Sequence, residues 1–358
     1  YNYICAIIQL RKLKTVDMKK LMSILIAVVL IQPAFAQSAA ELEAQGIDPV
    51  QPVKTKAEPA QKSGKAIPPG GLLMIPESGE DRVVAFDPQT GDLVEEYFIV
   101  DDPTKDFFST PIQLIQSPDK TKLYVSDQLK DHIVEFDIDG NYVGVFAPAG
   151  GANPDTLNNV RGIEFLAGTN HVLASDGSHD AIIEFNGNGH MVGNFTTPGF
   201  VDPFDILYWE TKDQYLVCDI SQPQANDAVK IFDNTGNYVS DLITGISFPE
   251  QVAIVPGGNI LVATFSSPSG IYEYTSDGTF VGYYDVVSSC RGVHELPNGN
   301  MLVTSGDGVY EVSKSNTIVS IKYHVGGANC RFISFVEPDD TTSVDVTFRV
   351  DMSQQTIA

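Results

Sequence analysis

Arginine and acidic side chains recur at one position of a repeating sequence. Arg161, Arg291 and Arg331 each stand at the start of an apolar segment, Glu250 occupies the same place in another copy, and Asp205 lies there to within one residue. A guanidinium group binds carboxylate, sulfate or phosphate through two parallel hydrogen bonds, so three of them together could hold an anion. The same residues could instead neutralise one another and plug the space between the segments. Plugging is the simpler interpretation, because arginines beside a dry channel must be paired in any case.

A second set of polar residues stands where other apolar segments end. Asp127, Asp176 and Asp219 occupy equivalent positions there, and His179 and Asp180 come shortly after one of them. The sequence predicts that these acids share a binding mouth with the arginines. His179 is the candidate general base, with Asp180 beside it to orient the ring. The simpler alternative is an exposed loop histidine without a chemical role.

The remaining histidines and acidic turns offer little metal chemistry. His294 stands beside Glu295 in an apolar segment, where a buried structural histidine is a simpler interpretation than a general base. No histidine pair has the spacing of a zinc site. The turns around Asp137 and Asp233 resemble calcium loops but lack the closing glutamate, so turn formation explains them. Three arginines at the mouth also count against a divalent metal, so the sequence predicts no cofactor and does not support calcium.

Two of the four cysteines directly precede arginines of the predicted mouth. In an exported protein, Cys290 and Cys330 could form a disulfide, since that compartment is oxidising. The bond needs Cα atoms within about 7 Å of each other, and the first strands of two neighbouring repeat units would lie at about the limit of that distance. The alternative is that both are small buried side chains, as is expected of Cys218.

One unit recurs about every 45 residues between Gly71 and Asp339, and it must position all of these side chains. Its clearest part is a hairpin whose turn contains Gly with Asn or Asp, preceded by two further apolar strands. Four antiparallel strands per unit predict the blade of a β-propeller. The region begins at a second strand, Leu72–Ile75, and ends on a lone first strand, Arg331–Phe335. Pairing that last strand with the three N-terminal strands would close an all-β ring of six four-stranded antiparallel blades and remove its open edge.

The units resemble NHL repeats, whose pattern is Pro-x-Gly-Ile, then Ile-Tyr-Val-Ala-Asp, then Arg-Ile-x-x-Phe-Asp. Arg161-Gly162-Ile163, Leu123–Asp127 and Val134–Asp137 carry the likeness, although the arginine of the third strand is mostly missing. The resemblance implies a propeller, a fold that serves as a binding platform and also in lyases, lactonases and esterases. In a propeller, the loops entering first strands and those leaving second strands share one face. The arginines and acids described above would therefore meet at one axial mouth.

The ends of the sequence predict export. Met18-Lys19-Lys20, an apolar run over residues 21–31 and Ala34-Phe35-Ala36 are typical of a signal peptide over residues 18–36, with an anchor helix as the alternative. Residues 1–17 are then expected to be upstream translation. Residues 37–70 are rich in Ala, Glu, Gln, Lys and Pro and predict a disordered linker. Residues 340–358 predict a linker and one strand, which resembles the first strand of β-sandwich modules of secreted bacterial proteins, some of them carbohydrate-binding.

The formal net charge of −24 restricts the partners. It argues against nucleic acid and against docking on anionic membranes, because both are bound by basic surfaces. With no specific catalytic motif, the sequence favours a monomeric, exported binding module in the periplasm, at the cell surface or outside the cell. Its partner would be a small anionic ligand, a saccharide, or a protein or peptide. The alternatives are a secreted lyase or hydrolase that uses the same mouth, and a structural spacer in a multidomain surface protein.

Overall fold

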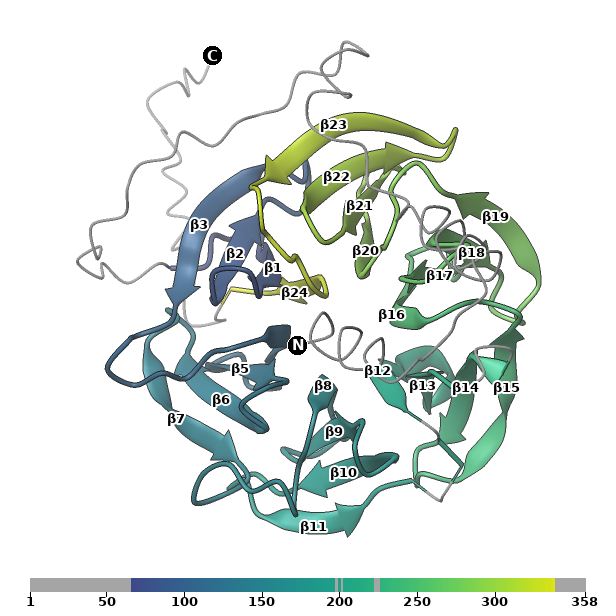
Figure 1. The fold of residues 1–358 in the computed structure, drawn as a ribbon. Helices are drawn as coiled ribbons and strands as arrows, with labels where there is room; N and C mark the ends of the chain where they lie inside the picture. The colour runs from purple at the N-terminus through teal and green to yellow at the C-terminus, as the bar shows by residue number, and fades with distance from the viewer. Residues whose placement is uncertain (1–65, 197–198, 201, 222–225, 339–358) are drawn as a thin grey trace, which may run out of the picture. The chain divides into compact units, whose positions relative to one another are not determined.

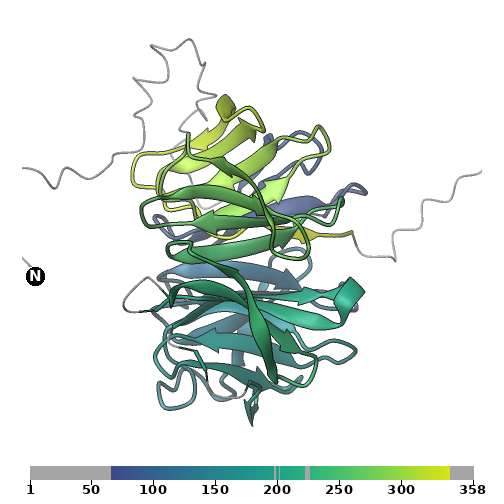
Figure 2. The ribbon, with the colours of Figure 1, turned by 90° about the vertical axis from the view of Figure 1, so that its right-hand side faces the viewer.

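The computed structural model describes residues 66–196, 199–200, 202–221 and 226–338, and these residues form a closed ring of six four-stranded antiparallel sheets (Figure 1). The predicted all-β, six-bladed propeller is therefore confirmed. Within the described ranges, the one helical element is a short 3-10 helix, Glu210–Lys212. Seen from the side, the strands of each blade run across the thickness of the ring (Figure 2).

Each blade runs from an innermost first strand to an outermost fourth strand (Figure 1). The first three blades are β24 (Ser334–Val336), β1 (Leu72–Glu77), β2 (Arg82–Phe86), β3 (Leu93–Val100); β4 (Pro111–Gln116), β5 (Lys122–Asp127), β6 (His132–Asp137), β7 (Tyr142–Ala147); and β8 (Val160–Phe165), β9 (Val172–Asp176), β10 (Ala181–Phe185), β11 (Met191–Asn194). The other three are β12 (Pro203–Trp209), β13 (Gln214–Asp219), β14 (Ala228–Asp233), β15 (Tyr238–Thr244); β16 (Pro249–Ile254), β17 (Ile260–Thr264), β18 (Gly270–Tyr274), β19 (Phe280–Tyr284); and β20 (Gly292–Glu295), β21 (Met301–Thr304), β22 (Gly308–Ser313), β23 (Thr317–His324).

The ring closes where the sequence predicts. The C-terminal strand β24 pairs antiparallel with β1, with Leu72 opposite Val336 and Met74 opposite Ser334. The first blade thus joins one strand from the end of the described chain to three from its beginning. This pairing covers the edge of β1 that would otherwise be open to association with another chain.

Burial varies across each blade and explains the sequence pattern. Every residue of the second strands β9 and β17 is buried, whereas the fourth strand β15 is mostly exposed or half-buried. A second strand has a neighbouring blade on each face, so both of its faces need apolar side chains. A fourth strand lies at the rim and has fewer neighbours. The near-continuous apolar second strands of the repeat follow from this placement.

The hairpin glycines also fasten one blade to the next. Gly189 and Gly236 have φ angles of +74° and +82°, and a Cβ atom at either would lie within 2.0 Å of a carbonyl oxygen, that of Phe146 or Phe195 respectively. These carbonyls belong to the preceding blade. Glycine is therefore required for two reasons: the backbone is in the left-handed conformation, and a side chain would collide with the carbonyl of the preceding blade.

Polar side chains bridge the first strands around the axis. Gln113 Oε1 accepts a hydrogen bond from the backbone N–H of Ile163 at 2.6 Å. Gln251 Oε1 accepts from the N–H groups of Val293 and Ile333, at 3.0 and 3.1 Å. These bridges tie blades together at the centre of the ring, where β-bulges at the beginnings of β4 and β16 interrupt the regular ladder.

The predicted signal peptide (18–36), the upstream residues 1–17 and the C-terminal strand within 340–358 lie outside the described residues. So does the predicted linker up to residue 65. Ile67, which falls within that predicted linker, packs in the core with Leu72 and Met74. Among the residues that the structure describes, no helix has the length and apolar character needed to span a membrane.

Candidate functional site

The axis of the propeller has two different ends. First strands begin at one end, and there the structure brings together Arg161, Glu250, Arg291 and Arg331, which we call the arginine mouth. First strands finish at the other end, where a cavity of ≈ 690 Å³ contains His294, and we call it the His294 pocket.

Two glycines let the backbone beside the mouth arginines pack closely against the next blade. Gly162 and Gly292 directly follow Arg161 and Arg291. A Cβ atom on Gly162 would lie 2.6 Å from the backbone oxygen of Phe204 in the next blade, and one on Gly292 would lie 2.8 Å from that of Arg331. The Arg-Gly pairs of the repeat therefore place the arginine backbone against the neighbouring blade.

Arg161 is paired and stacked. Its guanidinium forms a close ion pair with Asp202, donates to the carbonyl of Pro203 at 3.3 Å, and lies 4.2 Å from the ring centroid of Phe204. Asp202 directly precedes the first strand of the next blade, at a position that the sequence analysis did not single out. Burial raises the pKa of Asp202, and the charge of Arg161 opposes that rise.

Arg291 is paired in the same way, but with a predicted partner. Its Nη1 lies 2.7 Å from Glu250 Oε1, and its guanidinium lies 4.4 Å from the ring centroid of Phe265. Only 1% of the Glu250 side chain is exposed. Burial raises the pKa of Glu250, while Arg291, Arg331 and Arg161 act in the opposite direction.

Arg331 has no such carboxylate partner. Its Nε donates to Ser78 Oγ at 2.9 Å, and no described acid forms an ion pair with it. Burial lowers the pKa of Arg331 to about 10, with repulsion from Arg291 and Arg161 adding to the effect. Arg331 therefore stays charged at neutral pH at an energetic cost.

Within the arginine mouth, the guanidinium groups outnumber the carboxylates that form ion pairs with them. Three guanidinium groups face two paired carboxylates, Asp202 and Glu250. The Nε atoms of Arg161 and Arg291 are buried without a hydrogen-bond partner among the described residues, as is Glu250 Oε2. Buried N–H donors without acceptors are costly, and anionic oxygens would satisfy them.

Asp205 was expected at this mouth, and the structure places it deeper. Its Oδ2 accepts a hydrogen bond from the backbone N–H of Val252 at 3.0 Å, and 1% of the residue is exposed. Burial raises the pKa of Asp205 well above the usual range. Asp205 lies one residue beyond the position that the arginines occupy in other blades. It is equivalent to Gly162 and Gln113, and its side chain hydrogen-bonds the backbone of the next blade as Gln113 does.

The three aspartates that end second strands are also not free for a ligand. Asp127 accepts from the N–H groups of Ser109 and Thr110 at 2.7 and 2.8 Å, and Asp219 accepts from the N–H of Asp202 at 3.1 Å. Each carboxylate ties the loop leaving its second strand to the loop entering the first strand. Glu77, which the sequence analysis missed, accepts from Gly79 and Asn329 in the same manner. These acids hold the mouth loops in place, in contrast to the predicted binding role.

Asp176 does the same and also holds the candidate base. It accepts from Asn158 and Ser178 N–H groups at 2.9 and 3.0 Å, and its Oδ2 lies 2.7 Å from His179 Nδ1. The predicted orienting partner of His179 was Asp180, and the structure shows Asp176 instead. Asp180 has a φ of +53°, which turns the chain between the two strands. The His179 side chain is 42% exposed.

The three described cysteines are free and buried, so Cys290 and Cys330 do not form the disulfide considered above. Cys290 Sγ donates to the carbonyl of Val287 at 3.1 Å. The two side chains pack in different core clusters, and burial raises the pKa of each thiol. Within the described ranges, no group of three or more His, Cys, Asp and Glu side chains is placed to hold a metal ion.

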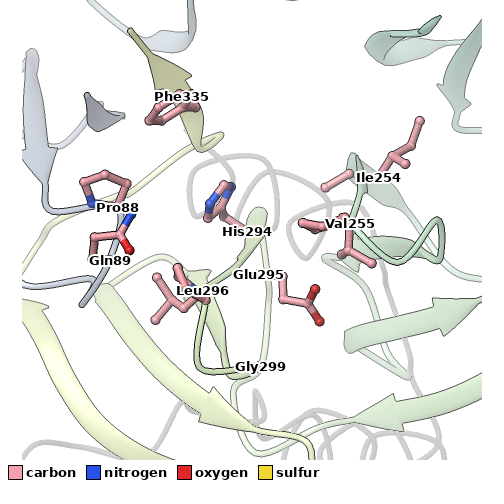
Figure 3. Close-up of a pocket in the computed structure, with 12 residues that line it drawn as sticks. Pro88, Gln89, Ile254, Val255, His294, Glu295, Leu296, Gly299 and Phe335 are labelled. Atoms are coloured by element: carbon pink, nitrogen blue, oxygen red, sulfur yellow. The ribbon is translucent and has the colours of Figure 1, made fainter. Parts of the chain in front are cut away.

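The His294 pocket lies between three blades at the opposite end of the ring. It is bordered by the turns after β16 and β20, by β24 and by the β2–β3 hairpin. Figure 3 shows the His294 ring between Pro88 and Gln89 on one side and Ile254 and Val255 on the other. Burial lowers the pKa of His294 to about 4, so the ring is neutral at pH 7. The sequence analysis considered this histidine only as a buried structural residue or a general base.

Comparisons with known proteins identify the architecture. No family model matches the chain, and no curated protein matches it. A chain in the crystal structure of a nidogen/laminin complex is 12% identical, with 75% of this chain and 98% of that chain covered and a TM-score of 0.60. A protein of unknown function from Bacteroides caccae is 15% identical over 75% and 99% of the two chains, with a TM-score of 0.53. A streptogramin B lyase structure gives 15% identity over 76% and 93%, with a TM-score of 0.49. At these identities, the first two likenesses show the fold alone.

Proposed function

We propose that the propeller is a binding module that holds an anionic group in the arginine mouth. The observation that carries this proposal is the incompletely compensated charge of Arg331, which is repelled by Arg291 and Arg161, forms no ion pair with a described acid, and is attracted by Glu250, an acid already paired with Arg291. A pure plug would pair each arginine with an acid, because unpaired buried charge is destabilising. Arg161 and Arg291 satisfy that rule, and Arg331 does not.

The geometry favours a carboxylate or sulfate group as the bound part of the ligand. Such a group offers several acceptor oxygens to the Arg331 guanidinium and to the unpartnered Nε atoms of Arg161 and Arg291. An acidic saccharide, a small organic acid or an acidic side chain of a protein could present it. The nidogen/laminin structure contains the same ring architecture in a protein complex, which is consistent with a protein ligand.

The test compares two sugars that share a ring and differ in charge. D-galacturonate and D-galactose are titrated into the full chain, and binding is measured by calorimetry and by the change in Tm. Ligand that binds only the folded state raises Tm. We expect galacturonate to bind and galactose not to bind. Arg331→Gln should lower the affinity at least tenfold, which corresponds to about 1.4 kcal/mol.

Two further variants keep this test decisive. Arg331→Lys retains the charge and loses the planar fork, so it should bind with intermediate affinity. Lys212→Gln removes a positive charge at the opposite end of the ring and should bind like the parent chain. No galacturonate binding, or equal binding by the parent and Arg331→Gln, would contradict an anion site and favour a plugged axis.

A second candidate function is a hydrolase or lyase, and the His179–Asp176 pair supports it. An Asp176 carboxylate that accepts the Nδ1 proton leaves Nε2 of the neutral ring as a proton acceptor, which is the arrangement of a general base. The pair lies beside the mouth, because a Cβ atom on the nearby Gly177 would be 2.9 Å from Arg161 Cζ. An arginine would then neutralise a substrate carboxylate while His179 accepts a proton.

This candidate is tested by turnover. Lactones and esters of uronic acids are incubated with the full chain, and acid release is followed by pH-stat titration. If the protein is an enzyme, His179→Gln abolishes turnover and leaves galacturonate affinity unchanged. If the parent chain turns over none of these substrates, binding without catalysis is favoured.

A further inference from the structure

The His294 pocket has the size of a small-molecule site. Its volume of ≈ 690 Å³ lies within the roughly 300–1,000 Å³ typical of ligand pockets. Its walls are mainly apolar and include Leu296, Pro297 and Pro256. The innermost strand of a blade contributes Phe335, which is 46% exposed although the neighbouring Val336 is fully buried.

A polar group without a protein partner points into this apolar space. No described residue hydrogen-bonds the ring of His294, which stands at the centre of the cavity (Figure 3). Because burial lowers its pKa to about 4, the ring at pH 7 offers one N–H donor and one nitrogen acceptor. The ring is half-buried, so its nitrogens face the cavity and a ligand hydroxyl or carbonyl could take the place of water there.

The charges at the pocket disfavour anions. The acidic residue on its wall is Glu295, whose carboxylate lies 3.6 Å from Lys314 Nζ. Lys314 in turn lies 2.8 Å from Glu273, so its charge is already compensated. None of the residues that border the cavity is an arginine or a lysine. A neutral ligand is therefore favoured here, in contrast to the arginine mouth.

Both ends of the described chain lead away from this cavity. Glu337 exchanges hydrogen bonds with the side chain of Gln116 in the second blade and forms an ion pair with Lys120 at 2.6 Å. Ile67 packs in the core cluster shared by the first and second blades, with Phe107 among its members. None of residues 66–71 and 336–338 borders the pocket, so the described chain ends do not cover it.

We infer that the His294 pocket is a second binding site, which takes an uncharged, largely aromatic or aliphatic small molecule with one hydroxyl or carbonyl group. The apolar body packs against Phe335 and Leu296, and the polar group hydrogen-bonds the His294 ring. This site is separate from the arginine mouth and does not depend on its proposed role.

The test uses 2-naphthol and two relatives with the same rings. Naphthalene lacks the hydroxyl group, and 2-naphthoate replaces it with a negative charge. Binding to the full chain at pH 7 is measured by fluorescence. We expect 2-naphthol to bind at one saturable site, about fivefold more tightly than naphthalene, since a hydrogen bond contributes about 1 kcal/mol. 2-Naphthoate should bind this pocket more weakly than 2-naphthol.

Matched variants locate the site. His294→Phe keeps an aromatic ring and should remove the preference for 2-naphthol over naphthalene. Phe335→Ala should weaken 2-naphthol binding about tenfold. Phe280→Ala removes a similarly exposed phenylalanine from the outer rim and should have no effect, as should Arg331→Gln.

Three outcomes would overturn the inference. They are no saturable binding of 2-naphthol, binding that is insensitive to both Phe335→Ala and His294→Phe, and equal affinity for 2-naphthol and 2-naphthoate with the parent chain. If residues outside the described ranges fill the cavity, the first of these results is observed. Because Phe335 is half-exposed, Phe335→Ala is expected to fold, and the test does not depend on His294→Phe folding.

Discussion

The two ends of the propeller axis use polar side chains in opposite ways. At the arginine mouth, most carboxylates accept hydrogen bonds from backbone N–H groups of the loops or pair with arginines. Asp176, for example, accepts from three backbone N–H groups and lies within hydrogen-bond distance of one histidine ring. At the other end, His294 is half-buried in a mainly apolar pocket and has no hydrogen-bond partner among the described residues. The carboxylates of the first end therefore serve mainly to hold its loops, whereas the histidine of the second end holds no described element in place.

The connections at each end account for the difference. At the mouth, strands of different blades are joined by longer loops whose backbone N–H groups need acceptors. Buried carboxylates at the ends of second strands supply them. At the opposite end, tight turns with glycines at positive φ satisfy their own backbone groups locally. Two buried carboxylates near that end, Glu273 and Glu311, accept from asparagine and lysine side chains instead of backbone N–H groups.

The largest expected effect concerns the carboxylates of the two ends. Asp176→Ala would leave the N–H groups of Asn158, Ser178 and His179 without their buried acceptor, and should lower the free energy of unfolding by about 3 kcal/mol. Asp233→Ala, in a hairpin turn at the opposite end, removes an acceptor of water-accessible N–H groups and should cost less than about 1 kcal/mol.

Urea unfolding measures both changes. Asp176→Asn, which keeps one acceptor oxygen, serves as the milder variant in case Asp176→Ala does not fold, and should lose about half as much. Equal losses from the Asp176 and Asp233 variants would show that the two ends do not differ in how they use carboxylates.

The pH dependence of stability should have opposite signs at the two ends. Burial lowers the pKa of His294 from 6.5 to about 4, so the unfolded state binds the proton more readily. Stability contributed by neutral His294 is therefore lost as pH falls from about 6.5 to 4, by about 2 kcal/mol after allowance for partial exposure. Burial raises the pKa of Glu250, so that group instead costs stability as pH rises through about 4.5.

Unfolding free energies of the parent chain, His294→Phe and Glu250→Gln between pH 4 and 7.5 separate the two contributions. The loss on acidification should be smaller in His294→Phe and larger in Glu250→Gln. An unchanged pH profile in His294→Phe would mean that its ring is not desolvated, and the contrast between the ends would weaken.

Within the mouth, substitutions of Arg331 and Arg161 should change the free energy of unfolding in opposite directions. Arg331→Gln removes a buried charge that is repelled by Arg291 and Arg161, and should raise the free energy of unfolding of the ligand-free chain by about 1 kcal/mol. Arg161→Gln breaks the pair with Asp202 and should lower it. Thermal and urea unfolding without ligand provide the measurement. A loss of stability in Arg331→Gln would indicate that Arg331 plugs the axis.

Much of the fold could be predicted from the sequence, because the same pattern of strands and turns recurs in nearly every blade. Turns with glycine and apolar second strands recur at a regular spacing. The lone first strand that ends in Phe335 can complete a blade only with the three N-terminal strands, and this pairing closes the ring. The meeting of Arg161, Glu250, Arg291 and Arg331 also follows, since equivalent positions of blades must converge on the axis.

The use of each polar side chain could not be predicted in the same way. Alignment placed Asp127 and Asp205 near the mouth, but it does not show that backbone N–H groups of other loops occupy their carboxylates. Asp202 lies in a loop whose length differs between blades, so no equivalent position pointed to it. The His294 pocket depends on how far three turns stand apart, which no local pattern specifies.

The smallest expected effect concerns Phe335, and it separates a ligand wall from a structural one. With 46% of the residue exposed, Phe335→Ala should change the free energy of unfolding by no more than about 0.5 kcal/mol. Phe280→Ala, at an exposed position on β19, should give a similarly small change and serves as the matched control. A buried phenylalanine usually costs about 3–5 kcal/mol when truncated to alanine. Urea unfolding that placed Phe335→Ala in that range would mean that Phe335 serves the fold, and the pocket end would then be as structural as the mouth loops.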